Sequence, residues 1–154
     1  TAQATPSMRG RSGAPAPKRS LVRMAISLLL QKPALAQSIR PPYLFGALRQ
    51  AGVPLLMEIV ALIQARPDIN TGGLLEHFAD REEATALQKL ALATEPGSDA
   101  ELTEVFQGAI RQLDDQTKLQ RRDELNEKEQ REALSADEQR ERWALIMEIK
   151  ATKA

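Results

Sequence analysis

The sequence contains no cysteine and few aromatic residues: one tryptophan, one tyrosine and three phenylalanines among 154 residues. The absence of cysteine excludes disulfides and thiolate-bound metals, and it fits a cytoplasmic protein. Most apolar residues are Leu, Ala, Ile and Val, a composition that favours packed helices over a β-sandwich. We therefore expect a helical fold.

Long hydrophobic runs are also absent. The most apolar stretch, Leu21 to Leu30, is interrupted by Arg23 and is much shorter than the roughly 20 residues that cross a bilayer. We predict neither a membrane span nor a signal peptide. The length allows one domain with a small appendage. Because the chain begins at Thr1 without an initiator methionine, we expect a fragment of a longer protein.

The charge is balanced overall but unevenly placed. Five of the 21 cations and none of the 21 acids lie in residues 1–23, so the remaining 16 cations face all 21 acids, a net charge of −5. A body of that sign is a poor general ligand for phosphate backbones. Residues 1–18 are rich in Pro, Gly, Ser and Ala, which predicts a disordered linker. The basic tail has no aromatic residue for stacking on bases, so strong direct nucleic-acid binding is not expected.

Apolar residues at helical spacing predict a bundle over residues 19–115. Its first helix begins near Leu21 and ends before Pro33, and short helices follow Pro33 and the pair Pro41-Pro42. Apolar residues cover most of the circumference of the helix predicted at 55–66. We expect that helix to be the central one.

Residues of capping type precede four of the predicted helices. They are Thr71, the pair Asp80 and Glu83, the pair Ser98 and Glu101, and the pair Ser135 and Glu138. The third pair begins a long helix whose apolar stripe thins after Leu113, and 15 of the 25 residues from Lys118 to Arg142 are charged. This helix should leave the bundle, turn after Leu134 and continue as a final helix over 136–151. The predicted fold is all-α, an N-terminal helical bundle followed by a long helix and a C-terminal helical hairpin over 116–154.

Few residues suggest catalysis. The lone histidine, His77, could act as a general base, but no nucleophile or second titratable partner accompanies it, which favours a surface helix residue. Gly72-Gly73 lacks the Lys-Ser/Thr ending of a phosphate loop. The carboxylates between Asp114 and Glu141 alternate with bases, as on a solvated helix face. We predict no catalytic, cofactor-binding or metal-binding residue.

The final helix carries an apolar cluster in an otherwise charged region. Trp143, Ile146, Met147 and Lys150 share one side at i, i+3, i+4 and i+7. Leu145 and Ile149 lie on another side, where two residues of the hairpin, Leu125 and Leu134, could meet them. The cluster could simply close the hairpin or fold back on the bundle, or it could bind a partner, since Trp and Met are frequent interface anchors. Periodicity does not decide between these interpretations.

Three segments together resemble the C-terminal helicase-binding domain of bacterial DNA primase. They read LVRMAISLLLQKP at 21–33, NTGGLLEHF at 70–78 and LSADEQRERW at 134–143. The resemblance covers about residues 20–154 and implies a helical bundle with a hairpin. It also implies a non-catalytic role, in which the hairpin docks on the N-terminal domains of the hexameric replicative helicase and couples RNA primer synthesis to unwinding. The zinc ligands and metal-binding acids of that family lie in other domains, so none is carried over.

On these grounds we predict partner contacts through the last helix, with secondary contacts from the helix before it. The primary residues are Trp143, Ile146, Met147, Ile149 and Lys150, and the secondary residues are Leu119, Arg122 and Leu125. The free chain is expected to be a monomer. Two alternatives stay open: a self-associating helical scaffold or adaptor, and a nucleic-acid module that uses the basic tail.

Overall fold

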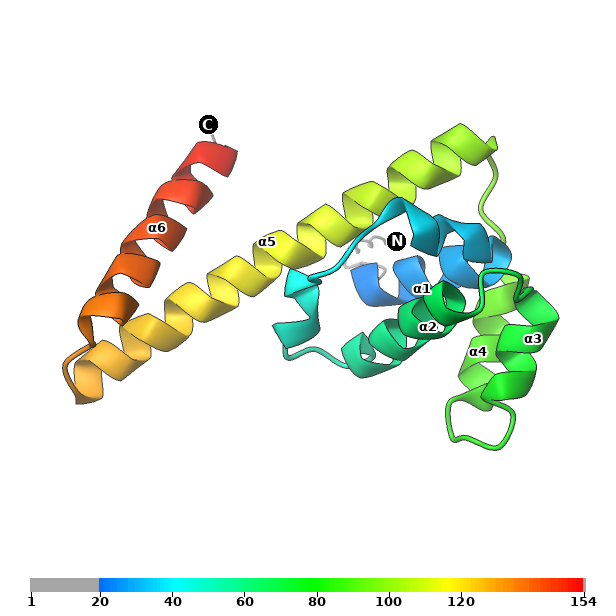
Figure 1. Cartoon of the computed structure of the whole chain (residues 1–154), viewed down its shortest axis with the longest axis horizontal. Helices are drawn as coiled ribbons and strands as arrows, with labels where there is room; N and C mark the ends of the chain where they lie inside the picture. The colour runs from blue at the N-terminus through cyan, green and yellow to red at the C-terminus, as the bar shows by residue number, and fades with distance from the viewer. Residues whose placement is uncertain (1–19, 154) are drawn as a thin grey trace, which may run out of the picture.

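The computed structural model describes residues 20–153, which form helices and connecting loops with no strand among them (Figure 1). The elements are α1 (Leu21–Gln31), η2 (Pro33–Ser38), η3 (Leu44–Ala47), α2 (Val53–Ala65), α3 (Thr71–His77), α4 (Ala84–Leu92), α5 (Asp99–Arg131) and α6 (Ala136–Lys153). The all-α prediction is confirmed. The linker predicted at 1–18 lies outside the described residues.

The central helix of the bundle is α1, and the expectation for residues 55–66 was wrong. Helix α1 contacts α2, α3, α4 and α5, and its residues 25–30 are buried without interruption. The polar member of that run, Ser27, is satisfied because its hydroxyl lies 3.0 Å from the carbonyl oxygens of both Leu90 and Ala93. A hydrogen-bonded hydroxyl can be buried at little cost, which allows α1 to be covered on all sides. Helix α2 instead leaves Leu55 and Leu62 partly exposed.

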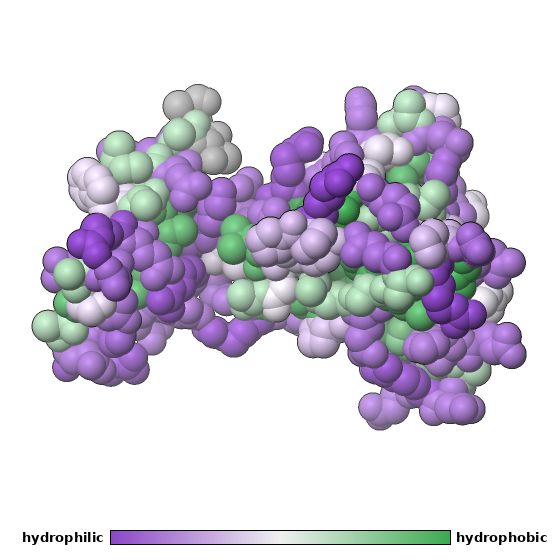
Figure 2. Space-filling model, in the orientation of Figure 1, coloured by the Kyte–Doolittle hydropathy of each residue, from purple (hydrophilic) through white to green (hydrophobic). Residues whose placement is uncertain are grey.

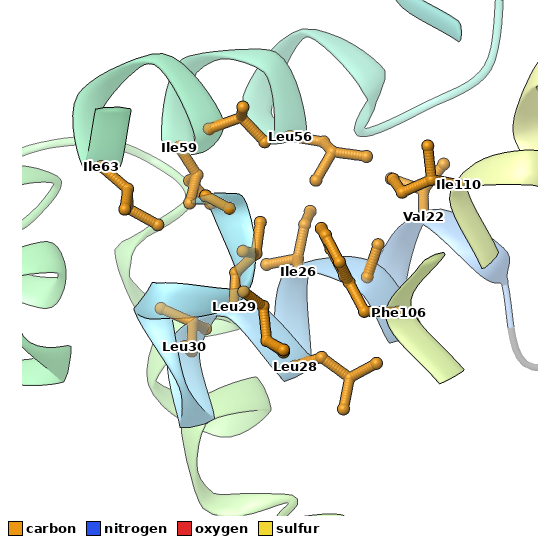
Figure 3. Packing of buried hydrophobic residues seen from close by; sticks show 14 of the residues in the cluster. Val22, Ile26, Leu28, Leu29, Leu30, Leu56, Ile59, Ile63, Phe106 and Ile110 are labelled. Atoms are coloured by element: carbon orange, nitrogen blue, oxygen red, sulfur yellow. The ribbon is translucent and has the colours of Figure 1, made fainter. Parts of the chain in front are cut away.

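The core lies where α1, α2 and the first half of α5 meet. Figure 3 shows Ile26 of α1 between Leu56 of α2 and Phe106 of α5. Phe45, Phe78 and Phe106 are 0–1% exposed, so all three phenylalanines fill the interior of the bundle, whereas Tyr43 is only partly buried. Burial of the whole apolar core supplies most of the driving force for the fold.

Two of the predicted capping boxes are confirmed. At the start of α5, the Glu101 amide donates to Ser98 Oγ at 3.2 Å and the Ser98 amide donates to Glu101 Oε1 at 2.8 Å. At the start of α6, the corresponding distances between Ser135 and Glu138 are 3.1 and 2.9 Å. Both helices therefore begin where the local sequence indicated.

The two other predicted caps were wrong. Helix α3 is capped by Asn70, whose Oδ1 accepts from the Gly73 amide at 2.8 Å. Thr71 is the first helical residue, and its hydroxyl donates to the Leu30 carbonyl, which ties α3 to α1. Helix α4 begins only at Ala84, three residues later than a capping box at Asp80 and Glu83 requires, and Glu83 has helical backbone angles, makes no capping hydrogen bond and pairs with Arg81. A side-chain cap requires an extended backbone at that position.

Helix α5 begins on the bundle and projects beyond it, and α6 folds back from its far end (Figure 1). The segment around η3 holds α5 through polar contacts: the Phe45 amide donates to Asp114 at 3.0 Å, and the Arg49 amide donates to Gln120 at 2.7 Å. Arg49 also forms an ion pair with Glu124. Helix α5 runs without a break through the predicted boundary at 115/116. The division of the chain into a bundle subdomain and a hairpin subdomain stays a prediction.

Candidate functional site

The hairpin formed by the distal half of α5 and by α6 has a very small apolar interior. Leu125, Leu134 and Leu145 form a separate cluster, with exposed fractions of 1, 6 and 9%. The predicted meeting of Leu125 and Leu134 with Leu145 is confirmed. Ile149, which was expected on the same side, is only partly buried. Three leucines bury too little surface to hold two long helices together alone, so polar contacts must contribute.

Charged side chains supply those contacts along the hairpin. Arg121 of α5 donates two hydrogen bonds to the Glu141 carboxylate of α6, at 2.7 and 3.0 Å. Lys128 Nζ lies 2.6 Å from Glu138 Oε2 near the turn. On the opposite edge, Arg142 Nε donates to Asn126 Oδ1 at 2.6 Å. Each exposed ion pair contributes little to the stability of the hairpin, but several of them together set the register of α6 on α5.

This arrangement predicts that acid weakens the hairpin. The hydrogen bond from Lys128, followed by that from the Ser135 amide, lowers the pKa of Glu138 from 4.5 to about 2. The bond from Arg121 also lowers the pKa of Glu141. Since the folded-state pKa is the lower one, this stabilisation is complete above pH 4.5 and is lost as the pH falls toward 2.

A carboxyl-carbon NMR titration measures this effect directly. We expect Glu138 to titrate with a midpoint near 2, and contacts between α5 and α6 to weaken over the same range. The substitution Glu138→Gln should abolish that part of the pH dependence of the contacts between α5 and α6. A Glu138 midpoint at the ordinary value of 4.5 would contradict the inferred role of Lys128.

The outer face of α6 exposes two large apolar side chains. Trp143 is 66% exposed and Met147 is 48% exposed. They are four residues apart on one helix, so they are neighbours on its surface. In the part of the chain that the structure describes, the other exposed large apolar residues, Leu44, Leu92 and Val105, belong to three other elements. Most of the hairpin surface in the view of Figure 2 is hydrophilic, so an apolar pair on α6 is unusual for this region.

The remaining predicted contact residues divide between the surface and the interior of the hairpin. Lys150 is exposed, and Ile146 is partly buried. On α5, Leu119 is partly buried and Arg122 forms an ion pair with Asp123 at 2.9 Å. Leu125 faces α6 inside the hairpin, so it supports the outer face and cannot contact a partner while the hairpin is closed.

One residue of the outer face escaped the sequence analysis. Arg140 lies three residues before Trp143, and its side chain is 73% exposed. Arg140, Trp143, Met147 and Lys150 follow one another at intervals of three, four and three residues, so they share one face of α6. We call these four residues the α6 outer face. The signal that identifies Arg140 is its position three residues before Trp143, which places the two side chains on the same side of a helix.

Within residues 20–153, no cluster of three or more His, Asp or Glu side chains is arranged to hold a metal ion. Several carboxylates between Asp114 and Glu141 are paired with bases or accept backbone hydrogen bonds. The His77 ring packs against the Phe78 ring, with centroids 4.9 Å apart. None of the helices in this described part of the chain has the length and apolarity to cross a bilayer.

Comparisons with known proteins agree with this geometry. A DNA primase of Salmonella typhimurium is 31% identical over 136 residues, which cover 88% of this chain and 23% of that protein. A DNA primase of Pasteurella multocida is 36% identical over 96 residues, 62% of this chain and 16% of that protein. The solved structure of the DnaG primase C-terminal domain from Vibrio cholerae matches with a TM-score of 0.70 and 29% identity, covering 82% of this chain and 96% of that one.

The chain thus spans less than a quarter of the curated primases that it matches, but nearly all of the solved C-terminal domain. The family model described as DNA primase DnaG DnaB-binding matches residues 22–145, from α1 into the middle of α6. The resemblance inferred from the three sequence segments is confirmed. The chain belongs to the DnaB-binding family of DNA primase DnaG domains.

Proposed function

We propose that this chain docks on the replicative DNA helicase through the α6 outer face, and that it couples RNA primer synthesis to unwinding at the fork. Membership of a DnaB-binding family supports the choice of partner. The single observation that supports the choice of surface is the exposure of Trp143 and Met147 side by side on an arm that projects from the bundle.

The energetics favour burial of these residues against another protein. Covering the exposed part of Trp143 contributes up to about 3 kcal/mol by area, and tryptophan is enriched among residues that dominate interfaces. Because the three leucines and the ion pairs inside the hairpin already hold α6 on α5, its outer face can bind a partner without unfolding the helix pair. A helix that lays its apolar face into a groove is a common mode of protein recognition.

We extend the proposal to the partner and to the parent protein. The helicase partner is hexameric and receives the hairpin on its N-terminal domains. The parent protein is a DNA primase, a DNA-directed RNA polymerase whose catalytic and metal-binding groups lie outside this chain. Within the parent protein, this chain acts as a monomeric docking module without strong nucleic-acid binding of its own.

Titration of the chain into purified hexameric helicase tests the proposal. Isothermal titration calorimetry should show saturable binding by the full chain, and a variant that ends at Arg142 should bind far more weakly. Equal affinities would refute the surface assignment, and no binding by the full chain would refute the function. Light scattering over a dilution series tests the scaffold alternative, which requires an oligomer that dissociates on dilution.

A further inference from the structure

The charges of α6 are segregated around the helix. Asp137, Glu141 and Glu148 are spaced by four and seven residues and therefore share one edge, while Glu138 lies next to them and faces α5. Each of these four carboxylates has a cationic partner within the hairpin. The pairs are Asp137 with Arg140, Glu138 with Lys128, Glu141 with Arg121, and Glu148 with Lys118.

The α6 outer face has the opposite character. Its two apolar residues, Trp143 and Met147, are flanked by Arg140 at one end and Lys150 at the other. None of the four carboxylates of α6 falls on this face, and among the described residues no carboxylate lies within 4 Å of Lys150 Nζ. Arg140 has an exposed partner one helical turn away, and such a pair is easily exchanged for another.

We propose that the helicase surface that receives α6 is an apolar recess with a carboxylate at each end, one facing Arg140 and the other facing Lys150. This inference rests on the proposed function and specifies the chemistry of the partner. The two cations are ten positions apart in the helix, so the partner carboxylates lie about 15 Å apart along the helix axis.

The expected role of these charges is to guide association and set the register of the helix. Charges at an interface rim act mainly on the association rate and on discrimination between partners. At physiological ionic strength the electrostatic influence of each charge extends only about 8 Å. Each cation therefore interacts with its own partner carboxylate, independently of the other cation. A phosphate backbone is a poorer fit, because it would approach the acidic edge of Asp137, Glu141 and Glu148 as well as the two cations.

Charge reversal at Lys150 tests the inference. At low ionic strength, Lys150→Glu should weaken helicase binding about tenfold, mostly through slower association, and the loss should shrink as salt is added. Lys150→Arg should retain binding. The matched control is Lys89→Glu, which makes the same charge change at an exposed position on α4, at the other end of the molecule, and should alter affinity less than about twofold.

Two results would overturn the inference. If Lys150→Glu and Lys89→Glu weaken helicase binding equally, only the overall charge matters, although the proposed docking itself stands. If Lys150→Glu lowers affinity for single-stranded DNA and leaves helicase affinity unchanged, the cations recognise phosphates. If the unaltered chain does not bind the helicase, the proposed function itself is refuted. Because Lys150 is exposed, circular dichroism should show that all three variants remain folded.

Discussion

Replacement of Trp143 by alanine is expected to weaken binding to the replicative helicase by about 30-fold or more, because an exposed tryptophan central to a docking face is a typical interface hot spot. The side chain is 66% exposed in the free chain, so most of its contacts in a complex would be with the partner. Removing them should accelerate dissociation more than it slows association. Surface plasmon resonance with immobilised helicase separates the two rates.

The matched control for this variant is Leu92→Ala. Leu92 is 84% exposed, more than Trp143, but it lies at the end of α4 and far from the α6 outer face. Its replacement should leave helicase affinity unchanged within about twofold. Neither variant should alter the midpoint of thermal unfolding by more than a few degrees, since both side chains are at the surface. Equal losses of affinity in the two variants would show that general surface hydrophobicity drives binding.

Replacement of Phe106 by alanine should lower the free energy of unfolding by about 3–5 kcal/mol. Phe106 is fully buried and packs against Ile26 of α1 at the meeting point of three helices (Figure 3). Its loss removes a large apolar side chain and leaves a cavity that the surrounding helices cannot fill without moving. Urea unfolding followed by circular dichroism at 222 nm measures the change, because all the regular secondary structure of residues 20–153 is helical.

The adjacent residue supplies the control. Val105 lies on the solvent side of the same helix turn and is 46% exposed. Val105→Ala should change the free energy of unfolding by less than about 1 kcal/mol, because alanine is a better helix former and little burial is lost. A similar cost for both substitutions would mean that the core does not lie on the α1 side of α5.

Much of the fold follows from local sequence signals. The first amides of a helix have no hydrogen-bond partner within it, and the capping boxes at Ser98 and Ser135 supply partners from side chains three residues apart. Neighbouring residues alone therefore specify where α5 and α6 begin. The thinning of the apolar stripe after Leu113 indicated that α5 leaves the bundle. Helical spacing likewise put Leu145 on a side of the last helix where Leu125 and Leu134 could meet it, and the structure brings these three leucines together.

Other features depend on contacts between distant residues. Thr71 and Asn70 are both good caps, and the choice of Asn70 follows from the hydrogen bond that Thr71 makes to Leu30, 41 residues away. The central position of α1 depends on the burial of Ser27, which carbonyl groups 63 and 66 residues away make possible. The contacts between the η3 segment and α5 also join residues about 70 positions apart and have no signature in either segment.

The candidate site combines both kinds of information. From the sequence alone, the helical periodicity of residues 136–151 determined that Trp143, Met147 and Lys150 share one side of the last helix. Only the tertiary structure decided that this side faces solvent while Leu145 faces α5. Periodicity specifies which side chains lie together, because it depends on backbone geometry within one helix. It does not specify which side is covered, because that depends on the surface that a neighbouring helix brings against it.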